Sequence, residues 1–229
     1  MEKLKQLFTK RNLLFVAIFA VLGFLALQVP VAELAGSKAK FTLFDAFAPI
    51  ATGFIGLIPG LVAVFLMQLG NFLVHGADIL DAGTIIRFLP MLFAAAYFAR
   101  GGKWNIVVPV LAIAAFNIHP IGRSAWVYSL FWLIPIATYF AREKSLIARA
   151  LGATFTAHAV GGALWVWTFG LSKAIWLSLI PVVAIERSLF AVGIAVTYLA
   201  VNNVLNILAE SKLPQLKRMV NRRYVFGAK

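Results

Sequence analysis

Long apolar stretches alternate with short polar ones along almost all of the 229 residues of the chain. Polar residues, Gly and Pro separate eight apolar segments: 12–29, 41–57, 61–74, 84–99, 104–118, 124–141, 147–169 and 174–208. The second and third segments are short, and Ile58-Pro59-Gly60 lies between them. We therefore expect a tight hairpin of two short helices there, within an all-α bundle.

The composition indicates the environment of such a bundle. Hydrophobic residues make up 62% of the chain and charged residues 13%, and the mean hydropathy is +0.91. A soluble domain carries about a quarter charged residues and has too little interior to bury so much apolar surface. We predict one integral membrane domain in a prokaryotic plasma membrane, with six to eight transmembrane segments in residues 12–208. Basic segments flank it at 1–11 and 209–229.

The charge distribution predicts the orientation. The chain has 21 Lys and Arg residues against 8 Asp and Glu, a formal charge of +13. Eight alternating spans that start from a cytoplasmic N-terminus put fifteen basic residues inside: Lys3, Lys5, Lys10, Arg11, Arg100, Lys103, Arg142, Lys144, Arg149, Lys212, Lys217, Arg218, Arg222, Arg223 and Lys229. Four fall outside: Lys38, Lys40, Arg123 and Lys173. This bias predicts that both termini are cytoplasmic, and it explains the basic charge without a nucleic-acid partner.

Several kinds of chemistry lack their usual residues. The chain contains no Cys, which excludes disulfides, thiolate nucleophiles and Cys metal sites. Walker A, GxSxG and HExxH motifs are missing, and the three His residues have no close metal-ligand spacing. We expect no metal, no cofactor and no enzymatic activity. A transporter built on this chain would need an ion gradient or separate motor subunits.

The predicted topology gathers polar residues near the outer side, where each is a candidate for binding a substrate because ionisable groups in membrane segments are costly. These are Asp45, Asn71, His75, Arg87, His119, Arg123 and Glu186. Trp126, Trp165, Trp167 and Trp176 lie on the same side, either as an interfacial belt or stacked on a ligand. Alternatively, Glu186 or Asp45 pairs with Arg87 or Arg187 and only holds helices together.

Small residues recur at helical spacing in two segments. Ala153, Ala157 and Gly161 are four residues apart, and Ala20, Gly23 and Ala26 are three apart. Such ridges allow close approach of helix backbones, either within the protein or with a partner subunit.

Two stretches resemble a known family. The run from Phe44-Asp45 through Gly53, Gly56 and Pro59-Gly60 to Ala63 resembles the hairpin of short helices in substrate-binding S components of energy-coupling factor (ECF) transporters. The helix with Leu179 to Arg187, followed by a basic tail, is also similar to the end of those proteins. The resemblance implies capture of a vitamin or similar small nutrient from outside. Its implied partners are a transmembrane coupling subunit and a pair of ATPases, besides the membrane lipids.

Other functions remain open at this point. An intramembrane enzyme acting on a lipid or isoprenoid would use His119, His158 and Glu186 as acid and base groups. A noncatalytic scaffold subunit would use its charges for structure alone, and a stand-alone carrier would need no partner. The ligand's charge is also open, because Arg87 and Arg123 suit an anionic group whereas Asp45 suits an amine.

Overall fold

The computed structural model describes residues 9–33, 40–75, 82–99, 101–211 and 213–227, and this part of the chain is all-α apart from one small hairpin. The α-helices are α2 (Lys10–Leu27), α3 (Phe44–Phe47), α4 (Ala51–Ile55), α5 (Leu57–His75), α6 (Ala82–Ala99), α7 (Trp104–Ile118), α8 (Pro120–Ser124), α9 (Leu133–Tyr139), α10 (Leu146–Thr168) and α11 (Lys173–Ser211). The 3-10 helices are η1 (Ala48–Ile50), η2 (Trp126–Trp132), η3 (Pro214–Arg218) and η4 (Arg222–Tyr224). Strands β1 (Pro30–Glu33) and β2 (Lys40–Thr42) pair antiparallel. The predicted all-α class is confirmed, whereas the hairpin was not expected.

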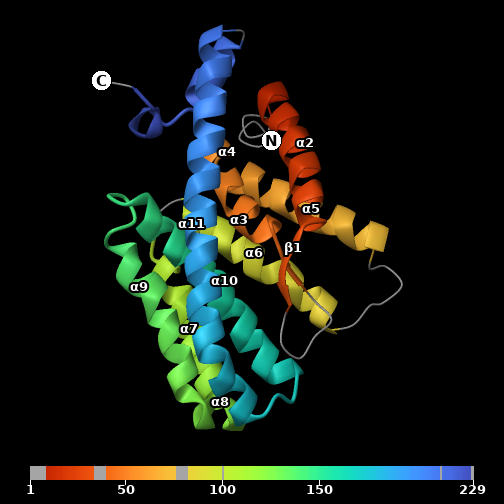
Figure 1. The fold of residues 1–229 in the computed structure, drawn as a ribbon, viewed down its shortest axis with the longest axis vertical. Coiled ribbons are helices and arrows are strands. Elements are labelled where there is room, and N and C mark those ends of the chain that lie inside the picture. Colours follow the sequence, from red (N-terminus) through yellow and green to blue (C-terminus); the bar gives the residue numbers. More distant parts are fainter. Residues whose placement is uncertain (1–8, 34–39, 76–81, 100, 212, 228–229) are drawn as a thin grey trace.

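Helix α11 is the axis of the molecule. Its 39 residues span about 58 Å at 1.5 Å per residue. Figure 1 shows α2 to α5 beside its upper half, α6 near its middle, and α7 to α9 beside its lower part, while α10, α3 and η3 make the main direct contacts with it. Two apolar cores follow from this arrangement, and α10 and α11 contribute to both. The first core contains Ala191 and Ile194 of α11, and the second contains Trp176 and Val183 of the same helix.

Helix α10 packs between α6, α7, α9 and α11. It begins where the Ser145 hydroxyl accepts a hydrogen bond from Ala148 N, which satisfies one of the free amides of the first turn. Small residues then allow its neighbours to approach. A Cβ on Gly152 would lie 2.2 Å from the Tyr97 ring of α6, and one on Gly162 would lie 2.6 Å from the Trp132 ring. This close approach explains why α10 is rich in Ala and Gly.

The segment with Pro59 and Gly60 differs from the sequence prediction. The chain turns at Gly56, whose φ of +86° favours glycine, and α5 already begins at Leu57. The predicted break at Ile58-Pro59-Gly60 is therefore wrong, because proline is tolerated in the first turn of a helix, where its missing N–H has no partner to lose. Gly60 serves another purpose. A Cβ there would lie 2.5 Å from Thr52 Cα, so α4 and α5 touch backbone to backbone.

Arginines from distant parts of the chain meet at one end of the bundle, which we call the basic end. Arg149 donates to the carbonyls of Phe98 and Ala99 at 2.6 and 2.8 Å, and buried Arg142 donates to the carbonyl of Tyr97 at 2.8 Å. These carbonyls end α6, where cations are favourable because the helix dipole is negative there. Arg223 reaches the same end and donates to the carbonyl of Glu143.

The C-terminal tail is fastened to α11 near this end. The Asn202 amide exchanges two hydrogen bonds with the backbone of Asn221, at 2.8 and 3.1 Å. The Asn203 amide donates to the carbonyl of Tyr224 at 2.9 Å and accepts from Phe226 N at 2.8 Å.

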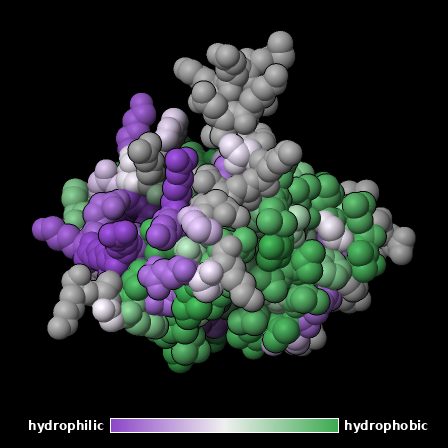
Figure 2. All heavy atoms as spheres, turned by 90° about the horizontal axis from the view of Figure 1, so that it is seen from above, coloured by the Kyte–Doolittle hydropathy of each residue, from purple (hydrophilic) through white to green (hydrophobic). Residues whose placement is uncertain are grey.

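Seen from above, hydrophilic residues gather on one side of the molecule, and hydrophobic residues cover much of the rest (Figure 2).

Two helices of the described residues, α5 and α11, are long and apolar enough to cross a membrane by length and composition. Several shorter helices are apolar as well, among them α2 and α7. Their outward side chains are not polar as they would be on a soluble bundle: on α2, Leu14 and Val21 are each 61% exposed, and on α11 Ile185 and Leu189 are each 64% exposed.

Candidate functional site

A buried arginine lies where the two apolar cores meet. Arg187 of α11 is only 2% exposed. It follows Val183 of the second core by one turn and precedes Ala191 of the first core by one turn, so it belongs to the same buried face of the helix. Burying a charge is costly unless it is paired and hydrogen-bonded. The groups around Arg187 therefore show how far its charge and its N–H groups are compensated by the protein.

The contacts of Arg187 leave two of its three guanidinium nitrogens, Nε and Nη2, without a hydrogen bond from the described residues. Its Cζ lies 4.3 Å from the Phe41 ring of β2 and 4.7 Å from the Phe190 ring. Among the described residues, the nearest carboxylate oxygen is Glu186 Oε2, which forms an ion pair with Nη2 at 3.9 Å, beyond hydrogen-bond distance. Among the described residues, Nε and Nη2 of Arg187 have no hydrogen-bond partner although both atoms are buried.

Two carboxylates flank this arginine without a hydrogen bond to it among the described residues. Asp45 lies at the start of α3, and its Oδ2 accepts a hydrogen bond from Thr42 N at 3.0 Å. Asp45 is close enough to Arg187 for electrostatic attraction, but no ion pair joins them among the described side chains. Glu186 is 16% exposed and projects about 100° away from Arg187 around the helix. The charge of Arg187 is thus balanced by two carboxylates that do not hydrogen-bond to it, and the N–H groups of Nε and Nη2 remain without an acceptor among the described residues.

Two aromatic side chains hold His158 of α10 between them, within electrostatic range of Arg187. Trp132 Nε1 donates to His158 Nδ1 at 3.0 Å, and the Tyr128 hydroxyl lies 2.8 Å from His158 Nε2. An indole N–H can only donate, so Nδ1 carries no proton and the ring is neutral with its proton on Nε2. That proton points to the Tyr128 oxygen. The hydroxyl hydrogen of Tyr128 is then available for another acceptor.

Helix η2 explains how both aromatic residues reach one imidazole. It is a 3-10 helix of seven residues, longer than the three or four that are common. Because a 3-10 helix turns by about 120° per residue, Tyr128 and Trp132 project in directions that differ more than they would on an α-helix. The Tyr128 ring also contacts the buried Trp176 ring of α11, with centroids 4.8 Å apart. Trp176 Nε1 has no hydrogen-bond partner among the described residues.

Other predicted site residues lie at the end of the bundle opposite the basic end. The His119 ring packs edge-on against Trp167, with centroids 4.9 Å apart, and His119 Nδ1 accepts from Ile121 N at 3.3 Å. Arg123 is exposed and donates to the carbonyl of Asn117 at 3.4 Å. Trp167 is 57% exposed and donates to the carbonyl of Ala115 at 2.9 Å. These contacts tie α7 and α8 to α10.

The remaining candidates are dispersed. Asn71 of α5 accepts from Gln28 Nε2 at 3.0 Å in an exposed position. His75 ends α5, and its side chain lies outside the described residues. Arg87 is exposed on α6, within electrostatic range of Asp45. Of the tryptophans, Trp126 is 54% exposed, whereas Trp165 is 7% exposed and lies 4.2 Å from the Phe169 ring.

Both ridges of small residues make contacts inside the chain. On α10, Ala153 and Ala157 are buried, and a Cβ on Gly161 would meet Pro90 of α6 at 3.5 Å. On α2, Ala20 and Ala26 pack against the first core, and a Cβ on Gly23 would collide with Met67 of α5. Of the two uses that the sequence allowed for such ridges, the structure shows the one within the protein.

From the sequence alone, Asp45 and Glu186 are candidates for the site, Arg187 is only a possible partner in a helix-pairing ion pair, and Tyr128 and Trp132 do not stand out. A signal for Arg187 was present. Trp176, Val183, Arg187, Phe190 and Ile194 recur at spacings of three, four or seven residues, and this is the buried stripe of α11. No comparable signal joins η2 to His158, which follows Trp132 by 26 residues.

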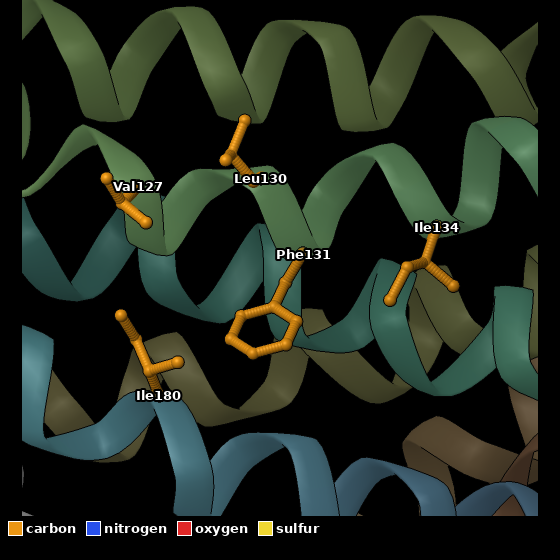
Figure 3. A pocket seen from close by; sticks show the side chains of 5 residues that line it. All are labelled: Val127, Leu130, Phe131, Ile134 and Ile180. Atoms are coloured by element: carbon orange, nitrogen blue, oxygen red, sulfur yellow. The ribbon is translucent and has the colours of Figure 1, made fainter.

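An apolar groove of about 280 Å³ opens beside Tyr128 and His158, between η2, α9 and α11. Its lining is formed by Val127, Leu130, Phe131, Ile134 and Ile180 (Figure 3). Phe131 also contacts Phe155 and His158, with ring centroids 5.8 and 6.2 Å away. The groove offers no polar side chain, so it fits a hydrocarbon chain better than a water-soluble group.

Comparisons with protein-family models, with curated proteins and with solved structures find no match to this chain. We call Arg187, Tyr128, His158, Asp45 and Glu186, with the adjoining Trp176, the buried polar cluster.

Proposed function

We propose that this protein is an integral membrane subunit that captures a small water-soluble ligand from the outer face of the membrane, as the S components of ECF transporters do. Support for the membrane comes from α5 and α11, which are long and apolar enough to cross it, and from the exposed apolar side chains of α2 and α11. The basic end is then cytoplasmic, as the positive-inside rule requires.

One observation carries the binding function: the unpaired, buried edge of Arg187 between the two apolar cores. A helix contact alone would be served by an apolar residue, because replacing buried ion pairs with apolar side chains is often neutral or stabilising. A buried donor pair left without an acceptor costs about 1–3 kcal/mol or more for charged groups. Such a cost is offset when a ligand provides the acceptor.

ATP-driven transport would require other subunits, because the chain has no Walker A loop. A transmembrane coupling subunit and an ATPase pair fit this need. The exposed basic residues of the cytoplasmic end, such as Lys144, Lys217 and Arg222, are available to such partners. By contrast, His158 has both nitrogens occupied by protein hydrogen bonds, which does not favour a role as catalytic base.

The test is to identify what the purified protein carries. Wild type and Arg187→Leu are purified in mild detergent, and their small molecules are extracted and compared by mass spectrometry. We expect one polar compound to be enriched near equimolar amounts in the wild type and lost in the variant. If extracts of the two folded proteins are the same, the proposal is wrong.

A further inference from the structure

We infer that the ligand carries a carboxylate, and that this carboxylate occupies the edge of Arg187 formed by Nε and Nη2. The inference rests on the proposed binding function and specifies the chemical class of its ligand. It adds to the sequence-level expectation, which left an anionic group and an amine equally possible.

The two unpaired nitrogens are the ones that a carboxylate needs. Nε and Nη2 carry parallel N–H bonds on one edge of the planar guanidinium, and this fork matches the two oxygens of a carboxylate. Both nitrogens of Arg187 are buried and lack a hydrogen-bond partner among the described residues, since Glu186 Oε2 approaches Nη2 only to 3.9 Å. A single missing hydrogen bond would fit a water molecule or a carbonyl, whereas a complete free fork indicates a bidentate acceptor.

Neighbouring polar groups of the cluster add further donors. The neutral His158 directs its Nε2 proton to Tyr128, so the Tyr128 hydroxyl hydrogen has no assigned acceptor within this network. Tyr128 is buried and within electrostatic range of Arg187. The indole N–H of Trp176, in ring contact with Tyr128, is also buried and unpaired. This excess of donors favours a ligand that accepts hydrogen bonds.

The acidic neighbours limit the charge of the ligand. Glu186 Oε2 lies 3.9 Å from Arg187 Nη2, and Asp45 attracts the same guanidinium. One arginine with two nearby carboxylates can accept a monoanion more easily than a dianion, because each added negative charge is repelled by both. A carboxylate is therefore favoured over a phosphate monoester, although both fit the arginine fork.

The probes are small aromatic compounds that differ only in the group offered to Arg187. Equilibrium dialysis at pH 7 compares radiolabelled benzoate with its neutral isostere benzamide and with phenyl phosphate, using ligand-stripped protein in detergent. We expect benzoate to bind at least about tenfold more tightly than either of the others, and Arg187→Lys to abolish this preference because lysine lacks the fork.

Glu186→Gln supplies a test that does not depend on replacing the buried arginine. Glu186 is partly exposed, and removing its charge should strengthen benzoate binding about threefold or more without changing benzamide binding. The matched control is Glu210→Gln on the same helix, at an exposed position near the basic end, which should leave both unchanged.

The outcomes separate the two proposals. Preferential benzoate binding that is lost in Arg187→Lys or increased in Glu186→Gln supports the carboxylate assignment. If benzamide or phenyl phosphate binds as well as benzoate, or if Glu186→Gln behaves like Glu210→Gln, the assignment is wrong. The binding function survives that result when the wild type still carries an enriched natural compound. Both proposals fail if no compound is enriched and no probe binds.

Discussion

The contact between α4 and α5 predicts that alanine substitutions at two glycines of α5, Gly60 and Gly70, have different effects on stability. In Gly60→Ala, the new Cβ would lie 2.5 Å from Thr52 Cα and 2.7 Å from Thr52 N. Backbone atoms cannot rotate away as a side chain can. Thr52 is also held in place, because its hydroxyl lies 2.7 Å from the carbonyl of Ala95 on α6 and donates to it. In Gly70→Ala the nearest atom is Phe24 Cδ2 at 4.0 Å, an ordinary contact.

The magnitudes follow from this difference. Both changes raise the free energy of unfolding by about 0.8–1 kcal/mol, because Ala has a higher helix propensity than Gly. In Gly60→Ala, overpacking against Thr52 also lowers the free energy of unfolding, by about 1–3 kcal/mol. The free energies of unfolding of the two variants should therefore differ by about 1–3 kcal/mol. For a chain of this length, that corresponds to a difference in Tm of about 2–12 °C.

The assay is thermal unfolding of both variants and wild type in the same detergent, followed by tryptophan fluorescence. We expect Gly70→Ala to have a Tm at or above that of the wild type, and Gly60→Ala to have a Tm at least about 2 °C below that of Gly70→Ala. Equal melting temperatures, or a more stable Gly60→Ala, would refute the close packing of α4 on α5.

Three further predictions concern other contacts. Trp132→Phe leaves His158 Nδ1 buried without its donor and should lower the free energy of unfolding by about 1–3 kcal/mol in a denaturant titration. Arg149→Met removes two hydrogen bonds to the last carbonyls of α6 and should cost about as much, with unchanged stability contradicting the capping role. Asn203→Ala frees part of the tail, so trypsin should cleave after Lys217 about tenfold faster than in the wild type; equal rates would show that this amide does not hold the tail.

Apolar periodicity and helix-ending residues were sufficient to predict most helices. The predicted segment 104–118 coincides with α7, because Gly101-Gly102 precedes it and His119-Pro120 ends it. The long final helix was also predicted, to within a few residues. These elements follow from local chemistry, which a single sequence contains.

The position of the turn before α5 was not predicted correctly. Pro59 and Gly60 are typical helix-breaking residues, but both lie within the first turns of α5. Proline is allowed in a first turn, and Gly60 is needed for contact with Thr52, a tertiary requirement that no local pattern encodes. Gly56, whose positive φ makes the actual turn, was not distinguished from the other glycines of this segment.

The buried polar cluster could be predicted only in part. The cost of charge in an apolar helix pointed to Asp45 and Glu186. Choosing Arg187 over Glu186 required knowing which face of α11 is buried. Tyr128 and His158 are joined by a long-range hydrogen bond across 30 residues, and that contact depends on how η2 packs against α10.

Membrane orientation underlies the whole proposal and has one direct test. The chain contains no Cys, so single cysteines report accessibility without background. Gly170→Cys and Ser124→Cys lie at the end predicted to be outside, and Gly102→Cys and Lys144→Cys at the basic end. A membrane-impermeant maleimide applied to intact cells should label the first pair, and the second pair only after permeabilisation. Labelling of the basic end in intact cells, or of neither end before lysis, would contradict the account.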